Sequence, residues 1–360
     1  MLAINIVVAI ALVVTAYCGE VSPQDQPLCG ILVLTFPMWL AAIVLLFVLD
    51  AIWWRRNVII PIVAVVAAWP MVWNVCPLNI GGGIPAGTSS DRVFTLLTYN
   101  VMNLVDQTGE YPGDSNPTLR YILDTDADIV CLEELTVFER NPSLHIHQAL
   151  LDSLHARYPY IVLSGQAMGI FSKYPVTNLH LGMSTDSPDY YCDMAAYTVD
   201  VNGRRLAVFS VHLQSYSLND GDKETYLELT KLKPDEQNVR DFKNTLLHKF
   251  QVAAMKRSYQ ARELARYVDY YGGENVVVCG DFNDVPGCYT LRTLAEHGLR
   301  EVWPEVAFGP TITFNADRFY FRIDHILWRG NFHPVDIRRG NERRSDHYPL
   351  LATFVWNEDE

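Results

Sequence analysis

The distribution of charge along the chain constrains its fold more than any other feature. Charged side chains are absent from three runs, which are residues 1–17, 31–49 and 58–73. Each run approaches the ~20 apolar residues that a helix needs to cross a bilayer. The sequence therefore predicts a three-helix transmembrane anchor in residues 1–78. The third run carries Pro61 and Pro70, and for it a buried hairpin in a soluble core is the alternative.

The orientation of this anchor follows from its few basic residues. The first run begins "MLAINIVVAI" and lacks the basic segment of a signal peptide, so it is predicted to remain as a membrane helix. Arg55 and Arg56 are the only basic residues in residues 1–84, and cytoplasmic loops favour such residues. We therefore expect a multi-pass protein of a bacterial inner membrane, with everything after the third run outside the cytoplasm. Cys18 and Cys29 bracket the first outer loop, where they could pair as a disulfide or stay as thiols.

The rest of the chain reads as one acidic soluble domain. Residues 79–90 are rich in Gly, Ser and Pro and are predicted to be a flexible linker to a domain of residues 91–360. Of the 28 basic and 41 acidic residues, two and three lie in residues 1–84, which leaves 26 and 38 and a net charge of −12. Affinity for a phosphate backbone depends on Lys and Arg, so a tight nucleic-acid groove is disfavoured.

Short apolar runs alternate with helical patterns in this domain, which indicates a layered α/β fold. The runs that are typical of buried strands are VFTLLTY, DIVCL, YIVLS, MGIFS, AAYTVDV, RLAVFSV, NVVVC, FYFRIDHILW and YPLLATFVW. The helical patterns cover residues 116–124, 143–157, 235–270 and 289–297. The polar segment Ser215–Gln237 is either a lid over the substrate or a solvated connecting loop.

Polar side chains stand at one end of six of these strands. They are Asn100, Glu133 with Glu134, His212, Asp281 with Asn283, Asp324 with His325, and Asp346 with His347. Each alone could be a turn former or a surface charge, but six together predict a site where strand ends meet loops. Carboxylate and amide oxygens are ligands that suit Mg²⁺ or Mn²⁺. Histidines suit proton transfer near neutral pH, and Asp324 could orient one of them.

The order of these motifs resembles that of the endonuclease/exonuclease/phosphatase superfamily. The motifs are TYNV, LEEL, VHLQS, GDFND, RIDHIL and SDHYPL, and the resemblance covers about residues 91–357. It implies a DNase I-like four-layer α/β sandwich, preceded here by the three transmembrane helices. It also implies a metal-dependent phosphoesterase, so that residues 91–360 would be the catalytic domain.

The resemblance assigns a role to each residue of the site. The implied metal ligands, for Mg²⁺ or Mn²⁺, are Asn100, Glu134 and Asp346, of which Glu134 is the main ligand and Asn100 is a contact of either the metal or the phosphate. The implied catalytic residues are His212 and Asn283 on the phosphate, Asp281 on the attacking water, and His347, as base or acid, oriented by Asp324. Whether Asp281 or His347 is the general base stays open.

Two departures from the family pattern affect these assignments. Glu133 stands where Gln is common, so it could share the ligand role and weaken the binding of highly anionic substrates. His325 follows Asp324 where inositol phosphatases carry Arg, which counts against a polyphosphoinositide substrate. Nucleic acid, lipid headgroups and small phosphoesters remain as substrates.

Beyond a substrate, the partner that we expect is the lipid bilayer, and no stable protein partner is predicted. One alternative is a non-catalytic membrane scaffold that retains the fold. Another is a transporter or sensor, which is disfavoured because the apolar runs contain no charge or polar cluster.

Overall fold

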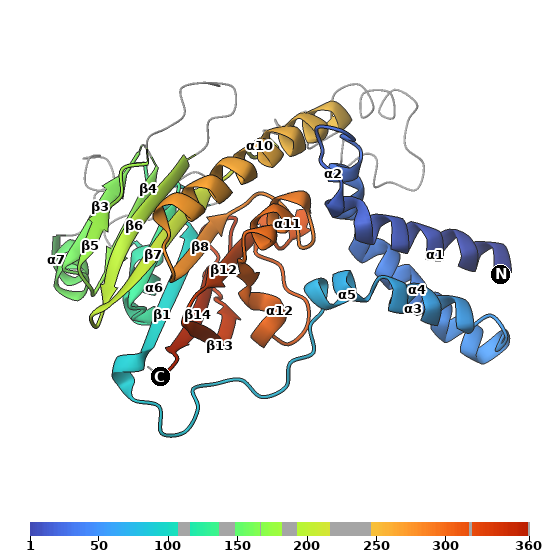
Figure 1. The fold of residues 1–360 in the computed structure, drawn as a ribbon, viewed down its shortest axis with the longest axis horizontal. Coiled ribbons are helices and arrows are strands. Elements are labelled where there is room, and N and C mark those ends of the chain that lie inside the picture. The colour runs from blue at the N-terminus through green and yellow to red at the C-terminus, as the bar shows by residue number, and fades with distance from the viewer. Residues whose placement is uncertain are drawn as a thin grey trace.

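The computed structural model shows an arm of apolar helices that projects from one side of a sheet-rich domain (Figure 1). The structure describes residues 1–106, 116–136, 148–165, 167–181, 193–216, 246–316 and 319–358. The segment Ser215–Gln237, predicted as a lid or a connecting loop, therefore lies mostly outside the described residues, from residue 217 to 237.

The arm contains two stretches that are long and apolar enough to cross a membrane, Leu2–Glu20 and Cys29–Trp53. Its α-helices are α1 (Leu2–Tyr17), α2 (Cys29–Leu32), α3 (Phe36–Trp53), α4 (Ile59–Ala67) and α5 (Trp69–Val75). The prediction of a third membrane-length helix is wrong, because the third run breaks at Ala68 into α4 and α5. Pro70 lies in the first turn of α5 and has no N–H to continue the hydrogen bonds of α4. The nine residues of α4 rise about 14 Å, roughly half of a hydrocarbon core.

The three passages of the arm lie side by side. Tyr17 at the end of α1 donates a hydrogen bond of 2.8 Å to Ala67 O at the end of α4, so the chain returns along α1 toward the domain. The second uncharged run ends at Leu49, but helix α3 continues through Asp50 to Trp53. Asp50 is fully buried, as is Asn5 of α1. Among the described residues, neither Asp50 carboxylate oxygen has a hydrogen-bond partner. Cys18 and Cys29 are free thiols.

Two six-stranded sheets form the centre of the C-terminal domain. Their strand orders are β13-β14-β1-β2-β4-β3 and β5-β6-β7-β8-β12-β9. The strands of the first sheet are β1 (Val93–Asn100), β2 (Ile129–Glu133), β3 (Tyr160–Ser164), β4 (Met168–Ser172), β13 (Phe332–Arg339) and β14 (Leu350–Trp356). Those of the second are β5 (Val176–Asn178), β6 (Asp193–Val201), β7 (Arg204–His212), β8 (Val276–Asp281), β9 (Arg300–Glu301) and β12 (Asp324–Arg329). β1 is parallel to β2 and β7 is parallel to β8, whereas the other neighbouring strands are antiparallel.

Helices cover the outer face of each sheet, which confirms the predicted four layers. The helices are α6 (Pro117–Thr125) and α7 (Gln148–Arg157) on the first sheet, and α10 (Leu247–Tyr271) and α11 (Tyr289–Glu296) on the second, with α12 (Val302–Val306) beside it. β1 shows why the strands read as continuous apolar runs. Phe94 and Leu96 pack between the sheets, whereas Leu97 and Tyr99 belong to the cluster under α6.

The sequence pattern missed the long strand β13 and the short strands β5 and β9. β13 contains Pro334, and the register with β14 shifts between Pro334 and Asp336, so polar residues and a bulge interrupt the alternation. The short strand β10 (Phe314–Ala316) was also missed, and its hairpin partner β11 (Phe319–Phe321) was not separated from β12, because FYFRIDHILW reads as one run. The expected helices at residues 116–124 and 289–297 match α6 and α11.

The arm is packed against the domain and shares its core. Leu12, Phe36 and Met71 of the arm belong to the same buried cluster as Phe282 and Val285. The expected flexible linker is fixed at its start, since Gly309 N donates to Pro77 O at 2.6 Å and Asn79 N donates to Ala307 O at 3.3 Å. The arm therefore has a defined position relative to the domain.

Candidate active site

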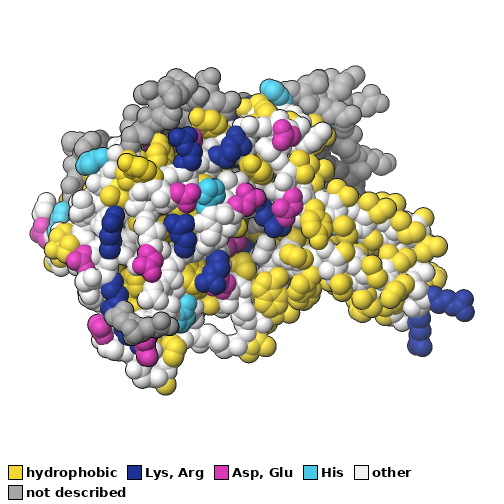
Figure 2. Space-filling model, viewed as in Figure 1, with side chains coloured by type: hydrophobic (Ala, Val, Ile, Leu, Met, Phe, Trp, Pro, Cys, Tyr) yellow, Lys and Arg dark blue, Asp and Glu magenta, His cyan; other side chains and the backbone are white. Residues whose placement is uncertain are grey.

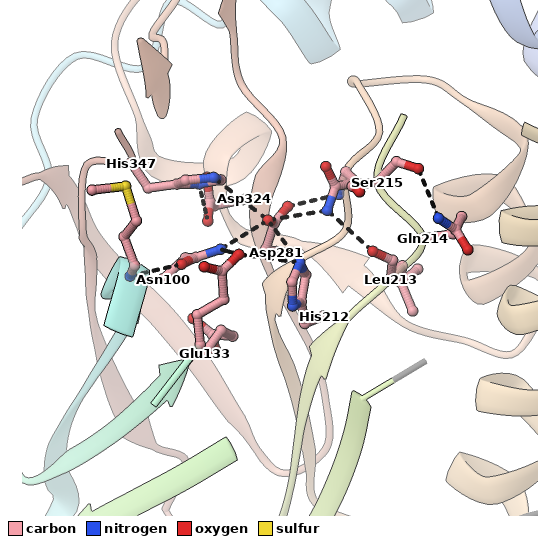
Figure 3. Close-up of polar contacts among 12 residues, drawn as sticks. Asn100, Glu133, His212, Leu213, Gln214, Ser215, Asp281, Asp324 and His347 are labelled. Atoms are coloured by element: carbon pink, nitrogen blue, oxygen red, sulfur yellow. Dashed lines mark hydrogen bonds and ion pairs between the residues drawn. The ribbon is translucent and has the colours of Figure 1, made fainter. Parts of the chain in front are cut away.

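The topology brings the polar strand ends to one edge of the sandwich. Asn100 ends β1 and is paired with Glu133 of β2, while His212 of β7 and Asp324 of β12 are both paired with Asp281 of β8. The two sheets face each other, so these residues meet across the sandwich (Figure 3). Every sequence-predicted site residue lies at this edge.

Asp281 is at the centre of the site, and it is buried. Its Oδ2 accepts hydrogen bonds from Asn100 Nδ2 at 3.2 Å and from Asn283 Nδ2 at 3.1 Å. The Nε2 atoms of His212 and His347 lie 3.6 Å and 3.5 Å from the same oxygen. Burial raises the pKa of Asp281, although the charge of His347 opposes this shift. One carboxylate oxygen is thus surrounded by four side-chain nitrogens.

His347 is held in one orientation by its neighbours. Its Nδ1 lies 2.9 Å from Asp324 Oδ2, and the Phe314 ring packs against the imidazole at 5.0 Å. Burial would lower the pKa of His347, but the carboxylates of Asp324 and Asp281 outweigh burial and raise it well above its ordinary value. The imidazole therefore favours the charged form, with Nε2 directed at Asp281.

Ser345 is a residue of this site that the sequence analysis missed. Its Oγ donates to Asn100 O at 2.7 Å and accepts from His347 N at 3.1 Å. The residue thereby ties the segment before β14 to the end of β1. Its place in the SDHYPL motif was the available signal.

Glu134 and Asp346 supply the negative charge on the exposed side of the site. Glu134 follows β2 with φ 53°, a conformation that turns the chain away from the strand, and its Oε1 accepts from Asn100 Nδ2 at 3.1 Å. Burial raises the pKa of Asp346, and the charges of Glu134 and Asp281 add to this shift while His347 opposes it. The carboxylates therefore repel one another.

This surplus of negative charge fits a bound cation. Within the described part of the chain, no Lys or Arg nitrogen lies within 4 Å of Glu134, Asp281 or Asp346. A buried group of Asp281, Asp324 and His347 could also hold a metal ion, because their ligand atoms lie within 4.8 Å of one another. Oxygen donors suit a hard divalent ion such as Mg²⁺ or Mn²⁺.

The two departures from the family pattern both point away from the site. Glu133 Oε1 accepts hydrogen bonds from Thr98 at 3.0 Å and Ser210 at 3.1 Å inside the sandwich, and burial raises its pKa well above the usual range. His325 lies on the face of β12 opposite to Asp324. It contacts Glu301 at 2.7 Å and Asp284 O at 2.9 Å, so it supports the loop after β8 instead of facing a substrate.

A buried arginine, also missed by the sequence analysis, links two loops of the site. Arg257 of α10 donates to Gln214 O at 2.9 Å and to the Tyr216 hydroxyl at 3.0 Å, just after His212. Its Nε lies 3.3 Å from Asp284 Oδ2, just after Asn283. A charged residue on the buried face of a helix was the signal that could have been used.

These observations define a class of protein: a phosphoesterase fold whose site lies at the edge of two packed sheets. The chain matches the Endonuclease/Exonuclease/phosphatase family over residues 97–347, and it belongs to that family. Members are phosphoesterase hydrolases that include nucleases and phosphatases and generally use divalent metals. Residues 1–75 match a domain of unknown function, DUF8431.

The comparison with solved structures gives matches at low identity and with TM-scores below 0.5. An endonuclease/exonuclease/phosphatase from Beutenbergia cavernae is 19% identical, with a TM-score of 0.49 over 74% of this chain and 72% of that chain. The human Nocturnin catalytic domain with bound sulfate is 16% identical, with a TM-score of 0.46 over 75% and 96%. TDP2 from D. rerio, complexed with a single-strand DNA product, is 16% identical, with a TM-score of 0.45 over 73% and 98%. No curated protein matches the chain.

Proposed function

We propose that the protein is a membrane-anchored, divalent-metal-dependent phosphoesterase that hydrolyses phosphodiester bonds in the manner of a nuclease. The observation that carries this proposal is the convergence of Asn100, Asn283, His212 and His347 on one oxygen of Asp281. A carboxylate surrounded by amide and imidazole nitrogens is suited to position water beside a phosphate.

The residues divide into a group for the metal and a group for the proton transfers. Asn100, Glu134 and Asp346 would hold the ion, which supplies Lewis acidity and neutralises charge on the phosphate. Asp281 orients the attacking water and accepts its proton as the new P–O bond forms. His347, oriented by Asp324, donates a proton to the leaving oxygen as the ester P–O bond breaks.

His212 and Asn283 complete the site by contacting the scissile phosphate. His212 Nε2 lies 3.7 Å from Glu134 Oε1 as well as near Asp281, so it stands between the ligand group and the proton-transfer group. Asn283 is fixed by its own backbone, because its N–H donates to Asp281 Oδ1 at 2.8 Å. The Asn283 amide donates to Asp281 Oδ2 and to Leu213 O, each at 3.1 Å, so it exchanges one of these bonds when it binds a phosphate oxygen.

The membrane part of the proposal rests on the two apolar stretches of the arm. Arg55 and Arg56 follow α3, at the end of the arm away from the domain, where Figure 2 shows basic side chains beyond a continuous hydrophobic surface. Cytoplasmic loops favour basic residues, so the catalytic domain lies on the opposite, extracytoplasmic side of a bacterial inner membrane. The chain returns through α4 and α5.

A second candidate substrate is a phospholipid or sphingomyelin phosphodiester. The arm favours it because Met71 packs against Gly287, in the loop that follows Asp281, so the site is built directly onto the apolar helices. The alternative of a non-catalytic scaffold would have been favoured if these site residues had been lost.

The test uses the full chain in detergent with bis-p-nitrophenyl phosphate, in the presence of Mg²⁺, Mn²⁺ or EDTA. Asp281→Asn should lower the metal-dependent kcat by about 10²–10⁴-fold. The matched control is Asp269→Asn, because the Asp269 carboxylate also lies beside a histidine, 2.6 Å from His297 Nδ1, but outside the site. If the wild-type chain releases no nitrophenol with either metal, the phosphodiesterase proposal fails. If the wild-type chain is active, sphingomyelin and DNA are compared as its substrates.

A further inference from the structure

Large apolar side chains are exposed where the arm joins the catalytic domain. Their exposed fractions are 53% for Leu78, 88% for Ile80, 52% for Ile84 and 66% for Phe308. We name these four residues the junction surface. A folded domain in water gains nothing from holding such side chains in solvent, so a contiguous exposed apolar surface indicates a binding partner.

The backbone that presents the junction surface is fixed. Leu78 and Phe308 form an antiparallel bridge, and Gly309 N donates to Pro77 O at 2.6 Å. The Asn79 side chain donates to Pro304 O and Ala307 O, both at 3.0 Å. Leu78 and Phe308 are therefore displayed by two cross-linked segments, and Gly83 N, just before Ile84, donates to Val335 O at 2.9 Å.

The junction surface lies beside aromatic residues that are typical of a membrane boundary. Trp69 is 48% exposed and its ring lies 5.9 Å from that of Trp73, which donates to Pro304 O at 3.0 Å. Tyr17 reaches the same end of the arm through its bond to Ala67 O. Tyrosine and tryptophan concentrate at the membrane–water interface, so this end of the arm marks the outer boundary.

The apolar surface is continuous from the arm to the catalytic domain. Figure 2 shows hydrophobic side chains over the whole arm, and the same colour continues onto the adjoining edge of the domain. Charged side chains are mixed over the rest of the visible domain surface. The partner of the junction surface is therefore the same as that of the arm.

We infer that the junction surface inserts into the outer boundary of the bilayer, so that the catalytic domain itself binds lipid. This inference rests on the proposed membrane anchoring. With both the arm and the junction surface in contact with lipid, the domain is held in one orientation and the site stays at a constant height above the membrane. Substrates that reside at or arrive along the membrane surface are then the ones within reach.

The test places the photoreactive residue p-benzoylphenylalanine at single positions of the full chain. The protein is reconstituted in phosphatidylethanolamine–phosphatidylglycerol vesicles that contain an alkyne-tagged acyl chain. The test positions are Phe308 and Ile80. Val63 of α4, which is exposed on the arm, is the positive control, and Tyr270, near the end of α10 far from the arm, is the negative control. Phe308 and Ile80 should capture about tenfold more tagged lipid than Tyr270, because interfacial side chains reach the acyl chain boundary.

The outcomes separate the inference from the proposals on which it rests. Lipid capture at Val63 with background capture at both Phe308 and Ile80 would overturn the inference and leave the anchor intact. Background capture at all positions, Val63 included, would overturn the anchor and the inference together. A crosslinked dimer at Phe308 without lipid would assign the surface to a second copy of the chain and overturn the inference. Phosphodiesterase activity, measured on the same samples, reports separately on the enzymatic proposal.

Discussion

At the scale of single residues, the two adjacent glutamates at the end of β2 have opposite environments. Glu134 turns out of the strand toward Asn100, whereas Glu133 continues the strand and is hydrogen-bonded between the sheets. The sequence leaves their roles interchangeable, because it does not show which side chain points along the strand and which points off its end. The structure separates them by backbone conformation.

This separation predicts different results for the two matched substitutions. Glu134→Gln removes a charge from the ligand group and should lower kcat/KM by about 100-fold, a loss typical of damage to a metal site. Glu133→Gln replaces a side chain that already favours the neutral form, and kcat/KM should stay within about twofold, since a neutral isostere keeps the same hydrogen bonds. Steady-state kinetics at saturating Mg²⁺ measure both. Equal losses for the two variants would contradict the assignment.

At the scale of elements, helix α10 positions two loops of the site through one face. Arg257 binds the segment after β7 and lies against Asp284 after β8, and Gln260 accepts from Gln214 N at 3.0 Å one turn further on. Because a guanidinium donates in several directions at once, Arg257 can fix both loops together. His212 and Asn283 are thereby held relative to each other by a residue that touches neither.

Arg257→Lys tests this positioning role. Lysine retains the positive charge near Asp284 but loses the fork, so kcat should fall by about tenfold while KM changes little, because the reacting groups are misplaced and not removed. Arg266→Lys on the exposed side of the same helix is the matched control. A variant that loses thermal stability but keeps its kcat per folded molecule would show that Arg257 is purely structural.

The elements also show how far the sequence could predict the structure. Strand ends and their order located the site, because polar residues at the ends of apolar runs meet wherever the sheets place those ends. Strand β13 was not predicted because Pro334 and a bulge interrupt its alternation of polar and apolar residues. The role of Arg257 was not predicted, because it depends on which loops pack beneath α10, and this is known only from the tertiary structure. The length of the third apolar run predicts a membrane helix, whereas Pro70 within the run accounts for the break that the structure shows.

At the scale of the whole molecule, one buried ion pair links the arm to the sheets. Arg322 forms an ion pair with Glu301 and donates to Asn74 O, in the last turn of α5, at 2.7 Å. Burial alone would raise the pKa of Glu301, but Arg322 and His325 outweigh burial and lower it. Burial lowers the pKa of Arg322 even beside Glu301, yet a guanidinium stays charged at all ordinary pH values. The carboxylate is thus the titrating partner.

The sign of the pH dependence follows from this lowered pKa. Glu301 stabilises the fold fully above its unfolded pKa, about 4.3, and its contribution is lost as the pH falls through the folded pKa below that value. Glu301→Gln should cost about 3–5 kcal/mol at pH 7, as for other broken buried pairs, and progressively less below pH ~4.3. Thermal unfolding of both proteins from pH 3 to pH 8 measures the difference. A difference that grows as the pH falls would reverse the sign and reject the account.

The shared core of arm and domain makes a last prediction about the soluble fragment of residues 85–360. Removing the arm uncovers the loop after Asp281, because Met71 and Gly19 both pack against Gly287, and it breaks the 2.8 Å ion pair of Arg292 with Glu20. Each large apolar contact that is lost costs about 1.5–3 kcal/mol, and several together should lower Tm by about 10 °C or more.

Hydrogen exchange localises this effect within the fragment. The amides of residues 282–291 should exchange faster than in the full chain, whereas those of β2 and β4, on the far sheet, should be unchanged because the arm does not contact them. Met71→Ala in the full chain is the matched control, and it should reproduce part of the faster exchange without removing the arm. A fragment with the Tm, the exchange pattern and the kcat of the full chain would show that the arm is a tether alone. Faster exchange confined to residues 282–291, with a lower kcat, would show that the apolar arm supports the loop that carries Asn283.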